Sequence, residues 1–194
     1  MIDDLEKIVK SMADTAKKAG VLVVTGDTKV VPRGSIDKIF INTSGIGELI
    51  VDCPMSGKRA TPGDRVIING TIGDHGLAIF TARKDIDLDF EVRSDCAPLN
   101  SLILELVSKI PEVHVMRDPT RGGVATTLNE IALQSNVCIE LFEDALPIKT
   151  GVKDGCDILG LDPLYLANEG KFLCILPEKY VDDALEIMKK RSPG

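Results

Sequence analysis

Apolar residues follow two spacings along the chain, and each spacing predicts one kind of secondary structure. Residues three and four positions apart share one face of a helix, whereas residues in a strand alternate between two faces. Helical spacing is found at residues 3–19, 77–80, 99–110, 124–134, 149–159 and 180–190. Short apolar runs that predict strands are found at residues 21–24, 39–43, 65–70, 113–116, 137–142 and 172–176. The pattern therefore predicts a fold that mixes helices and strands.

A turn signal near residue 61 separates a thin N-terminal part from a longer C-terminal part. Residues 61–64 read Thr-Pro-Gly-Asp, which is typical of a turn. Residues 1–60 supply only one helix and two or three strands, which is little for an independent domain. Residues 61–194 supply enough elements for an α+β or α/β layer with helices packed against one sheet. We expect a domain boundary between residues 60 and 61, and a chain that is part of something larger.

Composition and charge narrow the classes of partner. The chain has 194 residues, of which 44% are hydrophobic, and a formal net charge of −7. This charge argues against broad nucleic-acid binding, which needs a basic face that displaces counterions. No apolar run approaches the length of a membrane span, and the acidic N-terminus lacks the apolar core of a signal peptide. We therefore expect no nucleic-acid or membrane partner, and a cytoplasmic location.

The cysteines are scattered and form no CxxC pair, which argues against a disulfide framework or a zinc site. Cys138 and Cys174 lie in predicted strands, and we expect both to be small buried side chains. Cys96 and Cys156 lie near polar turns and are the two candidates for exposed thiols. No histidine is close to a cysteine in sequence, so a thiol nucleophile has little support.

The most distinctive polar stretch is Arg117-Asp118-Pro119-Thr120-Arg121-Gly122-Gly123, between a predicted strand and a predicted helix. One interpretation is a helix cap, because Asp, Pro and Thr are common at helix starts, and we favour it for these three residues alone. The other is an anion site. The two glycines let backbone N–H groups approach an anion, and Arg121 offers a planar fork of donors. The Arg-Gly-Gly part favours the anion site, because a cap does not need two glycines after it.

Three further polar clusters lie at the ends of predicted strands, two after a strand and the one with Glu169 just before a strand. Asp27 and Lys29 flank Thr28: the carboxylate could hold Mg²⁺ or cap its own turn, and the lysine could act on a phosphate or a proton or simply be solvated. Glu169 could be a general base, and His75 a proton shuttle or a phosphate contact. Taken alone, Glu169 and His75 are more often turn residues. Four junctions of this kind at strand ends together favour phosphate or nucleotide chemistry.

Several of these stretches, in this order, resemble the HypE family of hydrogenase maturation factors. They are Thr25-Gly26-Asp27-Thr28-Lys29-Val30-Val31, Ile41-Asn42-Thr43-Ser44-Gly45-Ile46-Gly47, Gly70-Thr71-Ile72-Gly73-Asp74-His75-Gly76, Asp118-Pro119-Thr120-Arg121-Gly122-Gly123 and Ala167-Asn168-Glu169-Gly170. The match runs essentially end to end, and GDTK, DPTRGG and NEG in this order are fairly specific. The wider PurM-like superfamily includes aminoimidazole ribonucleotide synthetase, selenophosphate synthetase and thiamin-phosphate kinase, which share ATP-dependent activation of an oxygen or similar acceptor.

The resemblance implies a PurM-like α+β architecture of two domains. Residues 1–60 would be the C-terminal part of an N-terminal α/β domain that dimerises and holds ATP and Mg²⁺. Residues 61–194 would be a C-terminal α+β domain with helices packed on a mixed sheet. The implied reaction is the ATP-dependent dehydration of a carbamoylated C-terminal cysteine to a thiocyanate, the source of cyanide ligands for nickel–iron hydrogenase. The implied partners are the carbamoyltransferase HypF, the HypC–HypD complex as cyanide acceptor, and a second copy of the chain.

The same resemblance assigns roles to residues. Asp27 would bind Mg²⁺–ATP, and Lys29 and Glu169 would assist deprotonation of the thiocarboxamide nitrogen. Nucleotide or phosphate contacts would come from Asp27, Thr28, His75, Thr120, Arg121, Gly122 and Gly123. This is coherent chemistry, because turning an amide into a nitrile needs a phosphoryl leaving group and a base for the N–H protons.

The family also implies parts that this sequence does not contain. These are an upstream half-domain with further acidic Mg²⁺ ligands and a C-terminal tail that ends in the acceptor cysteine. We therefore expect a fragment that is inactive alone and leaves apolar surface exposed on residues 1–60. Two other hypotheses remain: a related PurM-like kinase or synthetase acting on thiamin phosphate, selenide or a purine intermediate, and a module that only packs or binds a partner.

Overall fold

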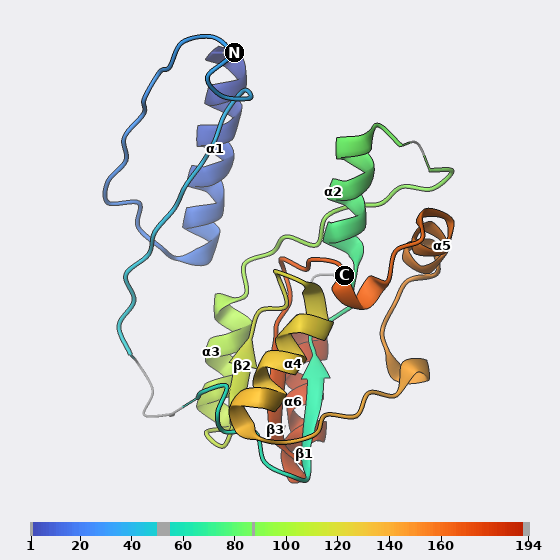
Figure 1. Cartoon of the computed structure of the whole chain (residues 1–194). Helices are drawn as coiled ribbons and strands as arrows, with labels where there is room; N and C mark the ends of the chain where they lie inside the picture. Colours follow the sequence, from blue (N-terminus) through green and yellow to red (C-terminus); the bar gives the residue numbers. More distant parts are fainter. Residues whose placement is uncertain (1, 50–54, 87, 192–194) are drawn as a thin grey trace. The chain divides into compact units, whose positions relative to one another are not determined.

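The chain divides into two compact units, Met1–Asp52 and Cys53–Gly194. The computed structural model describes residues 2–49, 55–86 and 88–191 (Figure 1). One of the described helices lies in the first unit, and the described strands and other helices lie in the second. None of the helices in these ranges is long and apolar enough to cross a membrane.

The first unit consists of α1 (Ile2–Ala19) followed by a long irregular segment. The predicted helix is confirmed. Acidic residues in its first turn and Lys17 and Lys18 in its last turn complement the helix dipole. Gly20, with a φ of 67°, ends the helix in the left-handed conformation that glycine adopts most easily. No described residue of α1 is buried, so its apolar face remains open.

The prediction of two strands in this unit is wrong. Residues 21–24 and 39–43 have no strand structure. The side chains of Val21–Val24 are 56–87% exposed, where the sequence had predicted a buried strand. A strand forms only when a neighbour accepts and donates its backbone hydrogen bonds, and no described segment does so here. The apolar surface expected on residues 1–60 is present, and it includes Phe40 and Ile46.

The second unit is built on an antiparallel sheet of three strands in the order β1-β3-β2. The strands are β1 (Asp64–Ile68), β2 (Val115–Arg117) and β3 (Leu173–Pro177). The expected mixed sheet is therefore wrong for the described residues, although the α+β class is confirmed. The predicted strand at residues 137–142 does not join the sheet, because it pairs with no described strand.

Helices cover both faces of this sheet (Figure 1). On one face, alternate residues from Phe172 to Leu176 pack against α3 (Asn100–Lys109) and α6 (Val181–Arg191). On the other face, Leu173 and Ile175 pack against α4 (Gly123–Ser135). The central strand is buried on both sides, which is why its sequence is a continuous apolar run.

A smaller apolar cluster joins α2 (Asp74–Lys84) to α5 (Thr150–Leu159). Leu77, Val152 and Cys156 form its buried part, and Leu88 and Val92 pack against it. This packing anchors the irregular segment after α2, which later carries part of the site. Short 3-10 turns at Glu143–Ala145, Pro163–Tyr165 and Glu178–Tyr180 complete the unit.

The division of the cysteines into buried and exposed side chains differs from the prediction. Cys174 is buried in β3 and Cys96 is exposed, as expected. Cys138 is exposed and Cys156 is buried, so these two predictions are wrong. Cys138 belongs to the run that does not enter the sheet, whereas Cys156 lies on the inner face of α5. Cys53 lies outside the described residues.

Candidate functional site

Strand register brings three of the polar motifs to one end of the sheet. Ile68 at the end of β1 and Arg117 at the end of β2 both pair with Leu173 at the start of β3. The loops that follow β1 and β2 therefore meet the loop that precedes β3. These loops carry the Gly70–Gly76 motif, the Asp118–Gly123 motif and the Ala167–Gly170 motif.

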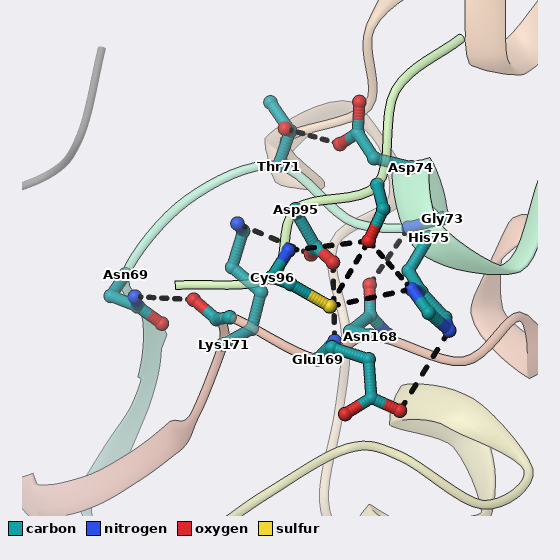
Figure 2. A network of polar contacts seen from close by, with 12 residues as sticks. Asn69, Thr71, Gly73, Asp74, His75, Asp95, Cys96, Asn168, Glu169 and Lys171 are labelled. Carbon is teal, nitrogen blue, oxygen red and sulfur yellow. Dashed lines mark hydrogen bonds and ion pairs between the residues drawn. The ribbon is translucent and has the colours of Figure 1, made fainter. Parts of the chain in front are cut away.

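Asn168 ties the three loops together. Its side chain is fully buried. Its Oδ1 accepts a hydrogen bond from the Gly73 N–H at 2.8 Å, and its Nδ2 donates to the carbonyls of Pro119 (3.2 Å) and Leu166 (3.0 Å). Each bond reaches a different loop or turn, so this amide sets how the motifs lie relative to one another. Figure 2 shows its bond to Gly73. The sequence showed only an asparagine in a turn, and nothing local reveals that it is buried.

The two glycines of the Asp118–Gly123 motif have a structural reason of their own. Both have positive φ, 68° for Gly122 and 62° for Gly123. A Cβ on Gly123 would lie 2.4 Å from the Leu164 carbonyl oxygen, so only glycine lets α4 start against this turn. Close packing therefore accounts for at least one of the glycines that had suggested a phosphate cradle.

Thr120 does not cap α4, so the cap interpretation is wrong. The helix begins at Gly123 with Gly122 as N-cap, and no side chain accepts a cap hydrogen bond. The Thr120 hydroxyl lies 2.8 Å from Asp118 Oδ2 and 3.3 Å from the Asn168 carbonyl oxygen. Thr120 thus closes the motif loop onto the loop of Asn168 rather than onto the helix.

Arg121 is exposed, and no residue in the described ranges forms a hydrogen bond or ion pair with it. The neighbouring Asp118 is also largely exposed and pairs with Arg117. An unpaired guanidinium beside the meeting point of three loops is available to an anionic group of a substrate.

A polar cluster links His75, Ser94, Cys96 and Glu169. Figure 2 labels His75, Cys96 and Glu169 of this cluster. His75 lies in the first turn of α2, and its Nδ1 is 2.8 Å from Ser94 Oγ. Its Nε2 is 3.8 Å from Oε1 of Glu169. Ser94 Oγ donates to Cys96 Sγ at 3.1 Å, and the same sulfur is 3.9 Å from His75 Nδ1. The two residues are 21 positions apart, so no histidine is near this cysteine in sequence.

A buried ion pair holds this cluster in place. Lys171 Nζ lies 3.2 Å from Asp95 Oδ2, and the two side chains are only 10% and 6% exposed. The other oxygen of Asp95 accepts the backbone N–H of Glu169 at 3.2 Å. Gly170 permits the contact, because a Cβ there would lie 1.8 Å from the Asp95 carbonyl oxygen. Residues 94–96 are thereby fixed beside Glu169, an arrangement that sequence reasoning missed.

Asp27, Thr28 and Lys29 belong to the other unit, Met1–Asp52. All three are exposed in the irregular segment after α1. The predicted site residues of the second unit belong to the three motifs that meet. One motif contains Thr120, Arg121, Gly122 and Gly123, another contains His75 in the first turn of α2, and the third contains Glu169.

Family models cover most of the chain. The AIR synthase related protein C-terminal domain matches residues 61–193, and the AIR synthase related protein N-terminal domain matches residues 1–49. The chain belongs to the AIR synthase-related family. The predicted PurM-like relationship is thus confirmed.

Among characterised relatives, this AIR synthase-related chain is similar to HypE proteins, as its motifs predicted. It is 48% identical to the carbamoyl dehydratase HypE of Cupriavidus necator, over 98% of this chain and 54% of that protein. A solved structure of HypE in complex with ATP is 54% identical, with a TM-score of 0.94 over 98% of this chain and 57% of that one. HypE in a HypE–HypF complex is 53% identical, with a TM-score of 0.95 over 98% of this chain and 63% of that one. The chain spans about half the length of the curated relatives it matches.

Proposed function

We propose that this chain forms part of an ATP-dependent carbamoyl dehydratase of the HypE type, which converts a carbamoylated C-terminal cysteine to a thiocyanate during hydrogenase maturation. The observation that carries the proposal is the meeting of three family motifs around Glu169 at one end of the sheet. Similarity to carbamoyl dehydratases over nearly the whole chain supports it. The related kinases and synthetases of the superfamily have no comparable support.

Glu169 is the proposed base. Its side chain is 38% exposed, so a substrate nitrogen can reach it, and its backbone N–H is held by Asp95. In the reaction, the thiocarboxamide oxygen bonds to the γ-phosphorus of ATP while the bond to ADP breaks. Loss of an N–H proton and departure of phosphate then leave the C≡N group. Lys29 is proposed to accept the other N–H proton.

Phosphate binding is proposed for Arg121, with Thr120, Gly122, Gly123 and Thr28 as further contacts. The unpaired guanidinium of Arg121 supports this role. Asp27 is an exposed carboxylate, and oxygen ligands of this kind suit Mg²⁺, which keeps several positions for phosphate oxygens and water. When bound, Mg²⁺ would neutralise phosphate charge. One carboxylate from this chain fits such a site as one of its ligands.

The proposal extends to partners and location. HypF would supply the carbamoyl group, the HypC–HypD complex would accept the cyanide, and the full-length protein would act as a homodimer. A HypE–HypF complex among similar structures supports the first of these. Four described cysteines are free thiols, which suits the reducing cytoplasm.

The test measures thiocyanate formation by mass spectrometry in the full-length gene product, carbamoylated by HypF and supplied with Mg²⁺–ATP. Glu169→Gln and Lys29→Ala should each slow the reaction by about 10²-fold or more, because each removes a proton acceptor. Glu140→Gln, at an exposed glutamate that belongs to none of the three motifs, should leave the rate unchanged. Full activity in both site variants would contradict the residue roles. A full-length protein that gives no heat in calorimetric titration with Mg²⁺–ATP would instead favour a partner-binding module.

A further inference from the structure

We propose that His75 is a positioning residue that takes the proton from Glu169 after each abstraction and passes it toward water through Ser94. This inference rests on the proposed function, in which Glu169 is the base. It deepens that function, because it assigns the route by which the base is restored. The arrangement that carries it runs from Glu169 to His75, both labelled in Figure 2, and from His75 to Ser94.

The hydrogen bonds of Ser94 define which nitrogen of His75 carries the proton. Ser94 Oγ donates its single hydrogen to Cys96 Sγ and accepts the backbone N–H of Cys96 at 3.3 Å. With the Ser94 hydroxyl assigned as donor to Cys96 Sγ, His75 Nδ1, 2.8 Å from the same oxygen, is assigned as the donor of their hydrogen bond. The neutral ring then has a free lone pair on Nε2, the nitrogen that faces Glu169.

The lone pair on Nε2 is placed to accept a proton from Glu169. The two atoms are 3.8 Å apart, a gap that a small side-chain rotation would close. In the transfer, the O–H bond of the protonated carboxyl breaks as the Nε2–H bond forms. The Nδ1 proton then passes to Ser94 Oγ as the Ser94 hydroxyl hydrogen passes to water, which leaves the ring neutral with its proton on Nε2. Release of the Nε2 proton to water and uptake of a proton at Nδ1 through Ser94 restore the starting tautomer.

Glu169 needs a group that takes its proton, because the reaction releases two N–H protons from each substrate molecule. Converting the thiocarboxamide to a nitrile breaks both N–H bonds of the substrate. The proton proposed for Lys29 can leave on the phosphate as hydrogenphosphate, and the one taken by Glu169 must reach water. Glu169 has to return to its carboxylate form before the next turnover, and among the described groups His75 is the titratable side chain that faces it.

The path from His75 through Ser94 reaches solvent, and the nearby carboxylates of Asp95 and Asp74 already have partners. Ser94 and Cys96 are exposed, so the far end of the line reaches solvent. Asp95 is held by Lys171, and Asp74 is held by Thr71 and Lys149. Because both ring nitrogens of His75 face protein groups, the geometry favours the proton shuttle over the phosphate contact for this residue.

The kinetic test measures repeated turnover of the full-length gene product, with HypF to recarbamoylate it and the HypC–HypD complex to accept the cyanide, because the relay restores Glu169 between turnovers. His75→Ala should lower the rate by about 10²-fold with little change in the KM for ATP, and added imidazole should restore part of it. A purely structural histidine would not be rescued. The double variant His75→Ala with Glu169→Gln should be no slower than Glu169→Gln alone, because His75 acts through Glu169.

The outcomes separate the two proposals. If Glu169→Gln keeps the parent rate, the proposed base is wrong. If Glu169→Gln is slow but His75→Ala keeps the parent rate, or is slow without imidazole rescue, only the relay is overturned.

A second measurement needs no activity. Nitrogen NMR of ¹⁵N-histidine in this chain, in alkaline solution where imidazoles are neutral, should show His75 protonated at Nδ1. Ser94→Ala should move that proton to Nε2. His114, the other histidine, pairs with Asp64 and should not change in this variant. A His75 ring protonated at Nε2 in the parent chain would overturn the proposal.

Discussion

Replacing Asn168 should loosen the whole site, because its side chain satisfies three backbone groups. Asn168→Ala leaves the buried Gly73 N–H without an acceptor and the Leu166 carbonyl without its donor. The Pro119 carbonyl keeps a partner, since the backbone N–H of residue 168 also donates to it at 3.2 Å. The substitution therefore strands two groups rather than three.

The expected loss follows from these two groups. A buried donor without a partner costs about 1–3 kcal/mol, and a stranded carbonyl usually costs less. Together they should lower the free energy of unfolding by about 3 kcal/mol, which for a unit of this size is a fall in Tm of roughly 10 °C. Domains of this kind are stable by about 5–15 kcal/mol, so the variant should still fold.

Urea unfolding of the parent and variant chains measures the loss, and amide hydrogen exchange at Gly73 locates it. The Gly73 amide should lose protection in Asn168→Ala. Asn129→Ala is the matched control, because Asn129 is exposed on α4 and bonds only to the Ala125 carbonyl of its own helix. It should change stability by less than about 0.5 kcal/mol. Equal effects of the two substitutions would refute the reasoning.

A carboxylate in the same place gives a pH-dependent version of the test. In Asn168→Asp, one oxygen would still accept from Gly73, but the other would face the carbonyl oxygens of Pro119 and Leu166. Protonation would restore one donor. The variant should therefore be closer to the parent in stability at about pH 4 than at neutral pH.

Three further predictions concern stability. Gly123→Ala should lower the Tm and cost about 2–4 kcal/mol, because φ is +62° and the new Cβ would lie 2.4 Å from the Leu164 carbonyl oxygen. Lys171→Met should cost about 3 kcal/mol in urea unfolding by leaving Asp95 charged and buried, and adding Asp95→Asn should recover part of that loss. Burial raises the pKa of Cys174 from 9.0 to about 12, so the unfolded chain releases a proton that the folded chain keeps. The contribution of this thiol to the free energy of unfolding should be fully present below pH 9. It should fall as the pH rises toward 12, by up to about 1.4 kcal/mol per pH unit.

Each of these has its own control. Gly160→Ala places a Cβ at a similar φ of +66° with no atom within 4 Å, so it should cost only about 1 kcal/mol. An equal cost at both glycines would contradict the steric argument. For the ion pair, a double variant as unstable as the sum of the two single variants would contradict it. For the thiol, the alkaline loss of stability should shrink in Cys174→Ala, and its persistence there would count against the assignment.

The helices show what local pattern can predict. The structure places α3, α4 and α6 within one or a few residues of their predicted spans. An amphipathic helix satisfies its backbone within itself, and its apolar spacing is visible in any short window of sequence. The motif loops were visible for a related reason, because glycine and charged residues gather at element ends.

Strands and burial show what local pattern misses. Residues 21–24 and 173–177 are both apolar runs, but only the second has neighbours on both sides. Cys138 and Cys174 looked alike in sequence, and only Cys174 is buried. A strand is completed by hydrogen bonds to distant residues, so its formation depends on partners that its own residues do not specify.

The sequence by itself determined the helices, the family and the loops that carry the chemistry. The tertiary structure alone decided how those loops meet. Asn168 reaches Gly73 across 95 positions, and Asp95 holds the Glu169 backbone across 74. These contacts depend on the register of three strands and on glycines that allow close approach, and no short stretch of sequence encodes either. The chemical groups are therefore local properties of the chain, whereas their geometry is a property of the fold.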